Sequence, residues 1–218
     1  MKIRCLTTGR VRGKRRTGPL RYLPGGWSDE TLPVHAFAVD HPDGICLFDT
    51  GQTARVSQRG YHPRWHPYLW LARFELEPEE EVASQLDPLT VRWVVISHLH
   101  TDHVGGLSAF AHADVLVSRI EWERAAGMPG RLRGYLPQHW PAGLNPRLVD
   151  FSGPAAGPFA TSHDVAGDGR LLMVPLPGHT PGHAGLLVDG ETLLAGDASW
   201  PGDELRVLGA HDPRLSPG

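Results

Sequence analysis

One apolar segment constrains the fold of this chain more than any other feature. Val91–Ser97 (VRWVVIS) is a near-continuous apolar run that leads directly into the polar sequence HLHTDHVGG. A run of this kind is typical of a strand buried on both faces of a sheet. Loops at the carboxyl ends of such strands carry the sites of α/β folds, because a rigid sheet holds short loops in place. The segment therefore predicts a layered α/β fold with a polar site at one edge of its sheet.

This polar loop is dense in metal-ligand side chains, namely His98, His100, Asp102 and His103. Imidazole nitrogens and carboxylate oxygens are the donors that Zn²⁺ accepts. We expect the loop to curl so that both His98 and His100 reach one ion, helped by the two glycines that follow. The alternative is a polar turn in which Asp102 caps a helix. Burying four such side chains without a partner is costly, so we predict a metal site.

A second motif, PGHTPGH, follows another apolar strand candidate, Leu171–Leu176. Its glycines and prolines indicate a tight loop. His179, at the apex of that loop, can complete a three-histidine site with His98 and His100. We expect His183, which begins the next strand, to be structural or to support a ligand.

Two further acids follow strand candidates. Asp197 follows Gly196 at the end of Thr192–Ala195, and its two carboxylate oxygens could bridge two cations. Asp49 lies in FDTG, at the end of Gly44–Phe48. A metal-bound histidine usually donates its other ring N–H to such a group. We therefore predict that Asp197 is a ligand and that Asp49 supports one.

Strand and helix candidates interleave along residues 1–218 without a linker, which predicts one α/β domain. HPDG separates Leu32–Val39 from Gly44–Phe48 and indicates a hairpin. Residues 127–170 are hard to assign. The other expected strands are Ile3–Thr8, Ala113–Ser118 and Ala184–Val188, and the expected helices are Glu79–Leu86, Leu107–Ala111 and Glu121–Ala126.

Two predicted loops each allow two interpretations. The basic segment after the first strand is either a solvated hairpin loop or a rim that attracts an anionic substrate; it contains Arg10, Arg12, Lys14, Arg15 and Arg16. Residues 52–74 are irregular and rich in aromatic side chains, including Trp65 and Tyr68. Long irregular segments often form binding loops, but these aromatics could instead pack on the core.

The net charge of −3 gives no support for binding nucleic acid. The chain shows neither a signal peptide nor an apolar run long enough to cross a membrane, so we expect a cytoplasmic protein. Cys5 and Cys46 lie in apolar stretches and are expected to be small buried hydrophobes.

In the order FDTG, HLHTDH, PGHTPGH and GD, these motifs resemble the metallo-β-lactamase superfamily, over about Leu32 to Asp197. The resemblance implies an αββα sandwich that holds two divalent ions, with zinc expected first and iron, cobalt or manganese as alternatives. It implies that His98, His100 and His179 hold one ion. Asp102 and His103 would hold the other, Asp197 would bridge the two, and Asp49 would lie behind them.

Within the superfamily, LPVHAFAVDHPDGICLFDTG and GDASW look most like the N-acyl homoserine lactonases and related quorum-quenching lactonases. This likeness implies that residues 52–76 form a substrate-binding excursion, with Trp65, Tyr68 and Trp200 in the pocket. The implied reaction is the opening of a small-molecule ester or lactone by a metal-bridging hydroxide. Asp102 would orient that hydroxide or carry its proton. Whether the protein forms a homodimer is left undecided by the sequence.

Two departures from the lactonases matter. Trp200 stands where they have a catalytic tyrosine, and an indole lacks the phenol that would protonate a leaving group. The lactonases also supply one more histidine to the second metal, several dozen residues after the bridging aspartate. Here His211 is the only histidine after Asp197. Either the C-terminal elements lie outside this sequence, which we expect, or His211 substitutes, or the second site is weak.

Two other functions remain. One is metallohydrolysis of a β-lactam, phosphotriester, thioester or phosphodiester. The basic segment gives slight support to a nuclease, but the acidic charge balance and the aromatic rather than basic excursion count more strongly against it. The other is a metal-binding protein whose incomplete second site does not turn over a substrate.

Overall fold

The computed structural model describes residues 1–16, 24–27, 31–62 and 72–215. Their strands form two sheets, one in the order β2-β1-β3-β4-β6-β7-β8 with β5 paired to β1, and one in the order β13-β12-β11-β10-β9. The strands of the first sheet are β1 (Lys2–Arg16), β2 (Pro24–Trp27), β3 (Leu32–His41), β4 (Gly44–Phe48), β5 (Ala72–Glu75), β6 (Val91–Ile96), β7 (Asp114–Ser118) and β8 (Arg147–Val149). Those of the second are β9 (His163–Asp164), β10 (Leu171–Pro175), β11 (Ala184–Val188), β12 (Thr192–Gly196) and β13 (Arg206–Gly209).

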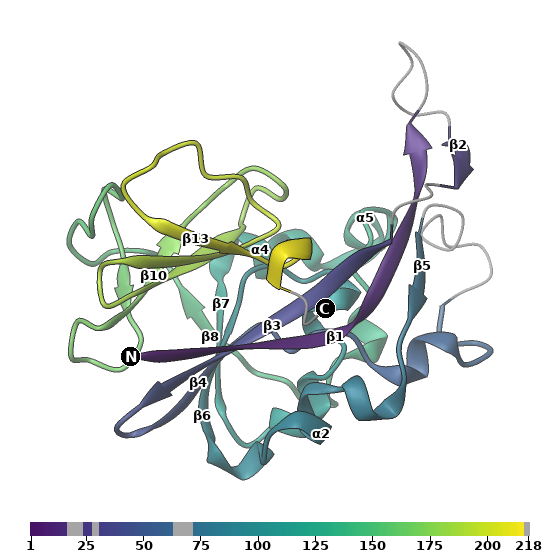
Figure 1. Cartoon of the computed structure of the whole chain (residues 1–218), viewed down its shortest axis with the longest axis horizontal. Coiled ribbons are helices and arrows are strands. Elements are labelled where there is room, and N and C mark those ends of the chain that lie inside the picture. Colours follow the sequence, from purple (N-terminus) through teal and green to yellow (C-terminus); the bar gives the residue numbers. More distant parts are fainter. Residues whose placement is uncertain (17–23, 28–30, 63–71, 216–218) are drawn as a thin grey trace.

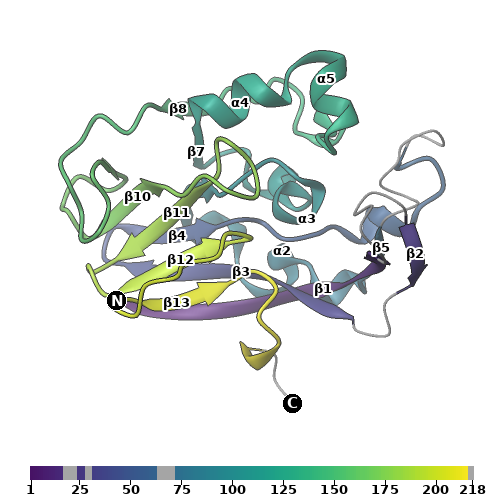
Figure 2. The ribbon, with the colours of Figure 1, turned by 90° about the horizontal axis from the view of Figure 1, so that it is seen from above.

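The helices are short. They are α2 (Val82–Gln85), α3 (Thr101–Val104), α4 (Arg119–Ala125) and α5 (Gly127–Leu132), and the 3₁₀ turns include η1 (Ala54–Ser57), η2 (Pro78–Glu80), η4 (Leu107–Phe110) and η5 (Pro137–His139). In Figure 1, β10 and β13 lie at the upper left, above β4 and β6, while the end of β1 extends with β2 and β5 to the upper right. In Figure 2, α4 and α5 lie on the side of the molecule opposite β1 and β13. Within the described residues, none of the helices has the length and apolar character needed to span a membrane.

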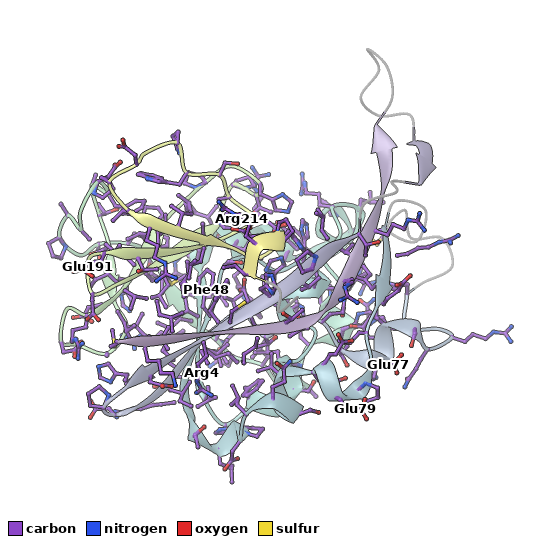
Figure 3. The ribbon with its side chains drawn as sticks, viewed as in Figure 1. Arg4, Phe48, Glu77, Glu79, Glu191 and Arg214 are labelled. Atoms are coloured by element: carbon purple, nitrogen blue, oxygen red, sulfur yellow. The ribbon has the colours of Figure 1, made fainter. Side chains whose placement is uncertain are left out.

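Alternation of side chains along the strands builds the layers. On β6, Trp93 and Val95 face the core between the two sheets, whereas Val94 and Ile96 face the core under the helices. Phe48 is fully buried between the sheets, and Figure 3 shows it inside the molecule. Both faces of the central strands are therefore covered, as the apolar run of β6 predicts.

A third apolar cluster covers the outer face of the second sheet. Leu187, Leu193 and Ala195 pack there with Phe159 and Trp200. The residues between β12 and β13 contain no helix, although parallel strands are usually joined through one. The predicted sandwich fold is confirmed, and irregular segments around Phe159 and Trp200 contribute to its outermost layer.

The prediction of a loop at Arg10–Arg16 was wrong, because β1 continues through this segment. Arg10 and Arg12 pair with Glu75 and Arg73 of β5, after a bulge between Thr7 and Arg10. The partner strand β5 comes from the irregular excursion, so the local sequence alone could not reveal the pairing.

The single helix expected at Glu79–Leu86 is divided into η2 and α2. Glu81 between them is extended, with φ −61° and ψ 144°. Its carboxylate accepts hydrogen bonds from Thr53 Oγ1 (2.9 Å) and Ala54 N (2.6 Å), which accounts for the break.

The two cysteines differ in environment. Both are free thiols, and Cys46 is buried as expected. Cys5 is exposed, so its predicted burial was wrong. Cys5 lies opposite Phe37 of β3, and its strand, β1, is separated from the parallel strands of the first sheet by β3.

Candidate metal centre

The predicted ligand loops follow the carboxyl ends of strands in both sheets. β4 and β6 run parallel, and so do β12 and β13, so these loops meet at one edge of each sheet. A hydrogen bond from Ala184 N to Ser97 O (2.9 Å) joins the two edges. The residues placed there are Asp49, His98, His179, Asp197 and His211, after β4, β6, β10, β12 and β13 respectively.

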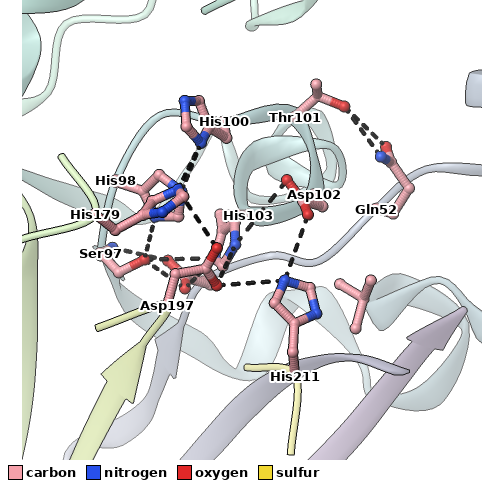
Figure 4. A network of polar contacts seen from close by, with 12 residues as sticks. Gln52, Ser97, His98, His100, Thr101, Asp102, His103, His179, Asp197 and His211 are labelled. Atoms are coloured by element: carbon pink, nitrogen blue, oxygen red, sulfur yellow. Dashed lines mark hydrogen bonds and ion pairs between the residues drawn. The ribbon is translucent and has the colours of Figure 1, made fainter. Parts of the chain in front are cut away.

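His98, His100 and His179 form a first histidine group. His98 Nε2 and His179 Nε2 each lie 3.0 Å from His100 Nδ1. The expected curl of the loop exists, because α3 begins at Thr101, directly after His100. One ligand atom from each histidine lies within 4.8 Å of the others, and Figure 4 shows the three rings converging.

The donor geometry of this group fits a metal ion. In a tetrahedral zinc site, neighbouring nitrogens are roughly 3.4 Å apart, close to the separations seen here. His100 Nδ1 faces two imidazole nitrogens, but one ring nitrogen offers either a single proton or a single lone pair. Hydrogen bonds within the group therefore cannot satisfy all three nitrogens, whereas a cation can accept a lone pair from each.

Burial favours the neutral form of two rings of this group, those of His98 and His100. It lowers the pKa of His98 well below the ordinary value, and the nearby His103 charge lowers it further. Burial likewise lowers the pKa of His100 to about 4. Metal ligation needs a neutral imidazole, so at neutral pH neither ring has to lose a proton to bind an ion.

A second acidic group lies beside the first. His103 Nε2 is 3.2 Å from Asp197 Oδ1 and 4.0 Å from Asp102 Oδ1. All three atoms are buried and make no hydrogen bond within the described protein. Because buried polar atoms are normally satisfied, this concentration of unsatisfied donors and acceptors fits a site for a cation.

Asp197 belongs to both halves of the centre. One of its oxygens lies 3.5 Å from His179 Nε2 and the other 3.2 Å from His103 Nε2. Burial would raise the pKa of Asp197, but the adjacent His103 and His211 lower it far below its ordinary value. The carboxylate is therefore ionised and has the position expected of a bridging ligand.

His211 is the residue that the sequence analysis underestimated. Its Nε2 lies 3.6 Å from Asp102 Oδ2 and 3.3 Å from Asp197 Oδ1, and with Asp102 and His103 it forms a potential metal group. A hydrogen bond between His211 Nδ1 and Pro33 O (2.6 Å) orients the ring. The role of His211 was hard to predict from the sequence, because this residue follows β13, a short strand that was not predicted.

Asp49 contacts His103 on the side of the ring away from Asp102 and Asp197. His103 Nδ1 lies 2.7 Å from Asp49 Oδ2, while Ser97 N donates to Asp49 Oδ1 at 2.8 Å. This contact leaves His103 Nε2 facing the acidic group. Asp49 has a φ of 59°, a conformation uncommon for a residue with a side chain, and such outliers concentrate at functional sites.

His183 supports the centre without joining any of its groups in the described residues. Its Nε2 accepts a hydrogen bond from Asp197 N at 3.3 Å, and its ring stacks on His98 at 5.1 Å. Gly196 has a φ of +55°, and a Cβ there would come within 2.9 Å of His183 Nε2. Only glycine therefore allows this approach.

Asp102 does not act as the helix cap considered above. His100 occupies the N-cap position of α3, and Asp102 lies in the first turn. The following glycines, Gly105 and Gly106, serve close packing rather than an unusual turn. A Cβ at Gly106 would come within 2.5 Å of Thr50 O.

The predicted pocket residues are less well supported. Trp65 and Tyr68 lie outside the described residues. In the described part of the excursion, Tyr61 is buried and stacks on His139 at 3.7 Å. Trp200 packs against Phe159, 4.9 Å away, on the outer face of the second sheet. These contacts give no support to a pocket role for Trp200.

Comparison with known proteins agrees with this geometry. The chain is 33% identical over 190 residues to the N-acyl homoserine lactonase AttM of Azorhizobium caulinodans, which covers 81% of this chain and 68% of that protein. It is 35% identical over 176 residues to a probable metallo-hydrolase of Mycobacterium tuberculosis, covering 72% of this chain and 53% of that protein. The chain thus spans about two thirds of the length of the lactonases it matches, or slightly less.

Solved structures share the fold. An N-acyl homoserine lactone hydrolase with N-hexanoyl-L-homoserine bound at its catalytic metal centre has a TM-score of 0.72 at 23% identity, covering 98% of this chain and 83% of that one. The dizinc quorum-quenching lactonase AidC has a TM-score of 0.58 at 15% identity, covering 89% of this chain and 70% of that one. The sequence profile described as the metallo-beta-lactamase superfamily matches residues 29–216. With its ligand loops gathered at one edge of a two-sheet sandwich, the chain belongs to the metallo-β-lactamase superfamily.

Proposed function

We propose that this protein is a metal-dependent hydrolase that opens lactones, with N-acyl homoserine lactones as the leading substrates. The observation that carries the proposal is the pair of adjacent ligand groups, one of three histidines and one built around Asp102, His103 and His211, with Asp197 between them. The identity of about one third to named lactonases supports the substrate class.

The residues have distinct roles in this proposal. His98, His100 and His179 would hold one divalent ion, and His103, Asp102 and His211 the other, with Asp197 shared. Two ions bound there would supply Lewis acidity, lowering the pKa of a water molecule and polarising the substrate carbonyl. Zinc is the first expectation for their identity.

Asp102 is the proposed catalytic residue. Its Oδ1 is buried and without a hydrogen bond in the described protein, beside His103 Nε2. A carboxylate oxygen in this position can accept a proton from the attacking water and pass it to the leaving alkoxide. Trp200 is packed against Phe159, so we assign it no part in that transfer.

In this proposal the second ion needs His211 as one of its ligands. Its pKa is affected first by burial, which lowers it, but Asp197 and Asp102 raise it above its ordinary value. The surrounding carboxylates thus favour a positive charge beside this ring, which a metal ion would supply. We propose that His211 substitutes for the more distant histidine of the lactonases.

The test is lactone opening by purified protein loaded with zinc or cobalt, followed by chromatography of the hydroxy-acid product. The wild type should open N-acyl homoserine lactones, and His100→Ala should lose at least about 100-fold in kcat/KM because one ligand of the first group is gone. His112→Ala, at an exposed histidine whose ring lies 3.1 Å from Pro88 O, is the matched control and should keep full activity.

Two results would count against the proposal. One is a fully loaded wild type that opens no lactone but cleaves a phosphodiester or thioester in parallel assays, which would move the chemistry to another substrate class. The other is a His100→Ala variant that keeps both metal and activity. We also propose a cytoplasmic location and a role in quorum quenching, the latter supported by the likeness to named lactonases.

A further inference from the structure

Glu121 is a fully buried carboxylate that lies outside the proposed ligand groups. It occupies the first turn of α4 and has 0% of its surface exposed. Acidic side chains are almost never fully buried unless they are paired. Its partners therefore show what this residue does.

Those partners belong to the two loops that carry the first histidine group. Leu99 N, between His98 and His100 in the chain, donates to Glu121 Oε1 at 3.1 Å. Thr180 Oγ1, directly after His179, donates to Glu121 Oε2 at 2.7 Å. One carboxylate thus joins loops that are some eighty residues apart in sequence, through the residues adjacent to all three histidines.

The surroundings of Glu121 tighten the same connection. Tyr135 is buried, with its ring 5.3 Å from that of His100, and the Glu121 carboxylate lies near its hydroxyl. Burial and then the Glu121 carboxylate raise the pKa of this phenol above its ordinary value. A Cβ at Gly182 would come within 2.2 Å of Glu121 N, so the second loop lies directly on the start of α4.

We infer that Glu121 is a positioning residue that holds the two loops of the first histidine group in register and thereby sets the affinity of that group for its ion. This inference rests on the metal centre of the proposed function. Hydrogen-bonding partners of ligand loops commonly change metal affinity by about 10–100-fold when they are removed. Here a single side chain serves three ligands.

The test measures cobalt binding to the full chain, by competition with a chromophoric chelator and by the visible spectrum of the bound ion. Glu121→Ala should weaken binding to the first group by about 10–100-fold and alter its spectrum. Performing the titration also in a His211→Ala background isolates this group. Glu123→Ala, at an exposed acid on the same helix, is the matched control and should bind as the wild type does.

Two further variants separate positioning from bulk stability. In Glu121→Gln the amide oxygen can accept from Leu99 N while the amide nitrogen donates to the Thr180 hydroxyl, so affinity should return to within a few-fold of the wild type. Thr180→Val removes one donor with little change of shape, and should weaken binding in the same direction as Glu121→Ala. Circular dichroism reports whether each variant is folded.

A folded Glu121→Ala variant with wild-type affinity and spectrum would overturn the inference. If that variant does not fold, wild-type binding by Thr180→Val would overturn it instead. No substrate enters these measurements, so the result stands whether or not the protein opens lactones. A wild type that binds no cobalt would contradict the metal centre itself and the inference with it.

Discussion

At the scale of single residues, Asp49 fixes the chemistry of a neighbouring imidazole. Its carboxylate accepts hydrogen bonds from Ser97 N and Ser97 Oγ and contacts His103 Nδ1, with no distance longer than 2.8 Å. Asp49→Asn replaces one carboxylate oxygen with an amide NH2 group. One of these three contacts then loses its acceptor, which disfavours the tautomer of His103 whose Nε2 carries the lone pair for the ion. We expect the affinity of the second group to fall by about 10–100-fold. Asp40→Asn, at an acid paired with Arg4 at the surface, is the control, and equal affinities in the two variants would contradict this role.

A pH dependence follows from His103 and His211. Burial alone would lower the pKa of His103, but Asp197, Asp49 and Asp102 raise it well above its ordinary value, and the pKa of His211 is also raised. The surrounding carboxylates therefore favour the protonated form of both rings in the metal-free protein. Their contribution to stability is present below the unfolded pKa of about 6.5 and is lost as pH rises through the folded value.

Binding of an ion to the second group should displace these protons. Calorimetric titrations at pH 7 in buffers of different ionisation enthalpy should thus show proton release, and apparent affinity should increase with pH. Buffer-independent heats would show that the two histidines are already neutral, contrary to the electrostatics of the site.

At the scale of elements, Trp200 belongs to the outer face of the second sheet. It lies near Phe159, Leu193 and Ala195, where the connection from β12 to β13 contains no helix. Trp200→Ala should lower the free energy of unfolding by about 2 kcal/mol through lost packing, with KM unchanged. Denaturant unfolding and steady-state kinetics provide the measurement. A raised KM at unchanged stability would instead place the indole in the substrate pocket.

The elements also show which parts of the site the sequence could predict. β6, β10 and β12 are apolar runs that end at ligand-type residues, so their loops and most of the candidate ligands were identified in advance. β13 was not, because a four-residue strand in parallel register with β12 is specified by distant pairing rather than by its own pattern. His211 was undervalued for the same reason. The extension of β1 likewise depends on β5, a partner from a distant segment.

At the scale of the whole molecule, the site depends on how two sheets meet. Ligands from the first sheet and from the second approach each other where the edges of both sheets are joined by the hydrogen bond between Ala184 N and Ser97 O. The order of the motifs predicted the sandwich, whereas the contacts between sheets, including the path through Glu121, required the folded chain. The centre is therefore a property of the assembled sandwich rather than of any one loop.

The most direct measurement of this account is the metal content of the purified chain after loading with zinc, by elemental analysis. The account predicts two ions per chain in the wild type and one in His211→Ala, because the first histidine group stays intact in that variant. A fully loaded wild type that holds one ion or none, or a His211→Ala variant that still holds two with wild-type affinity, would contradict it.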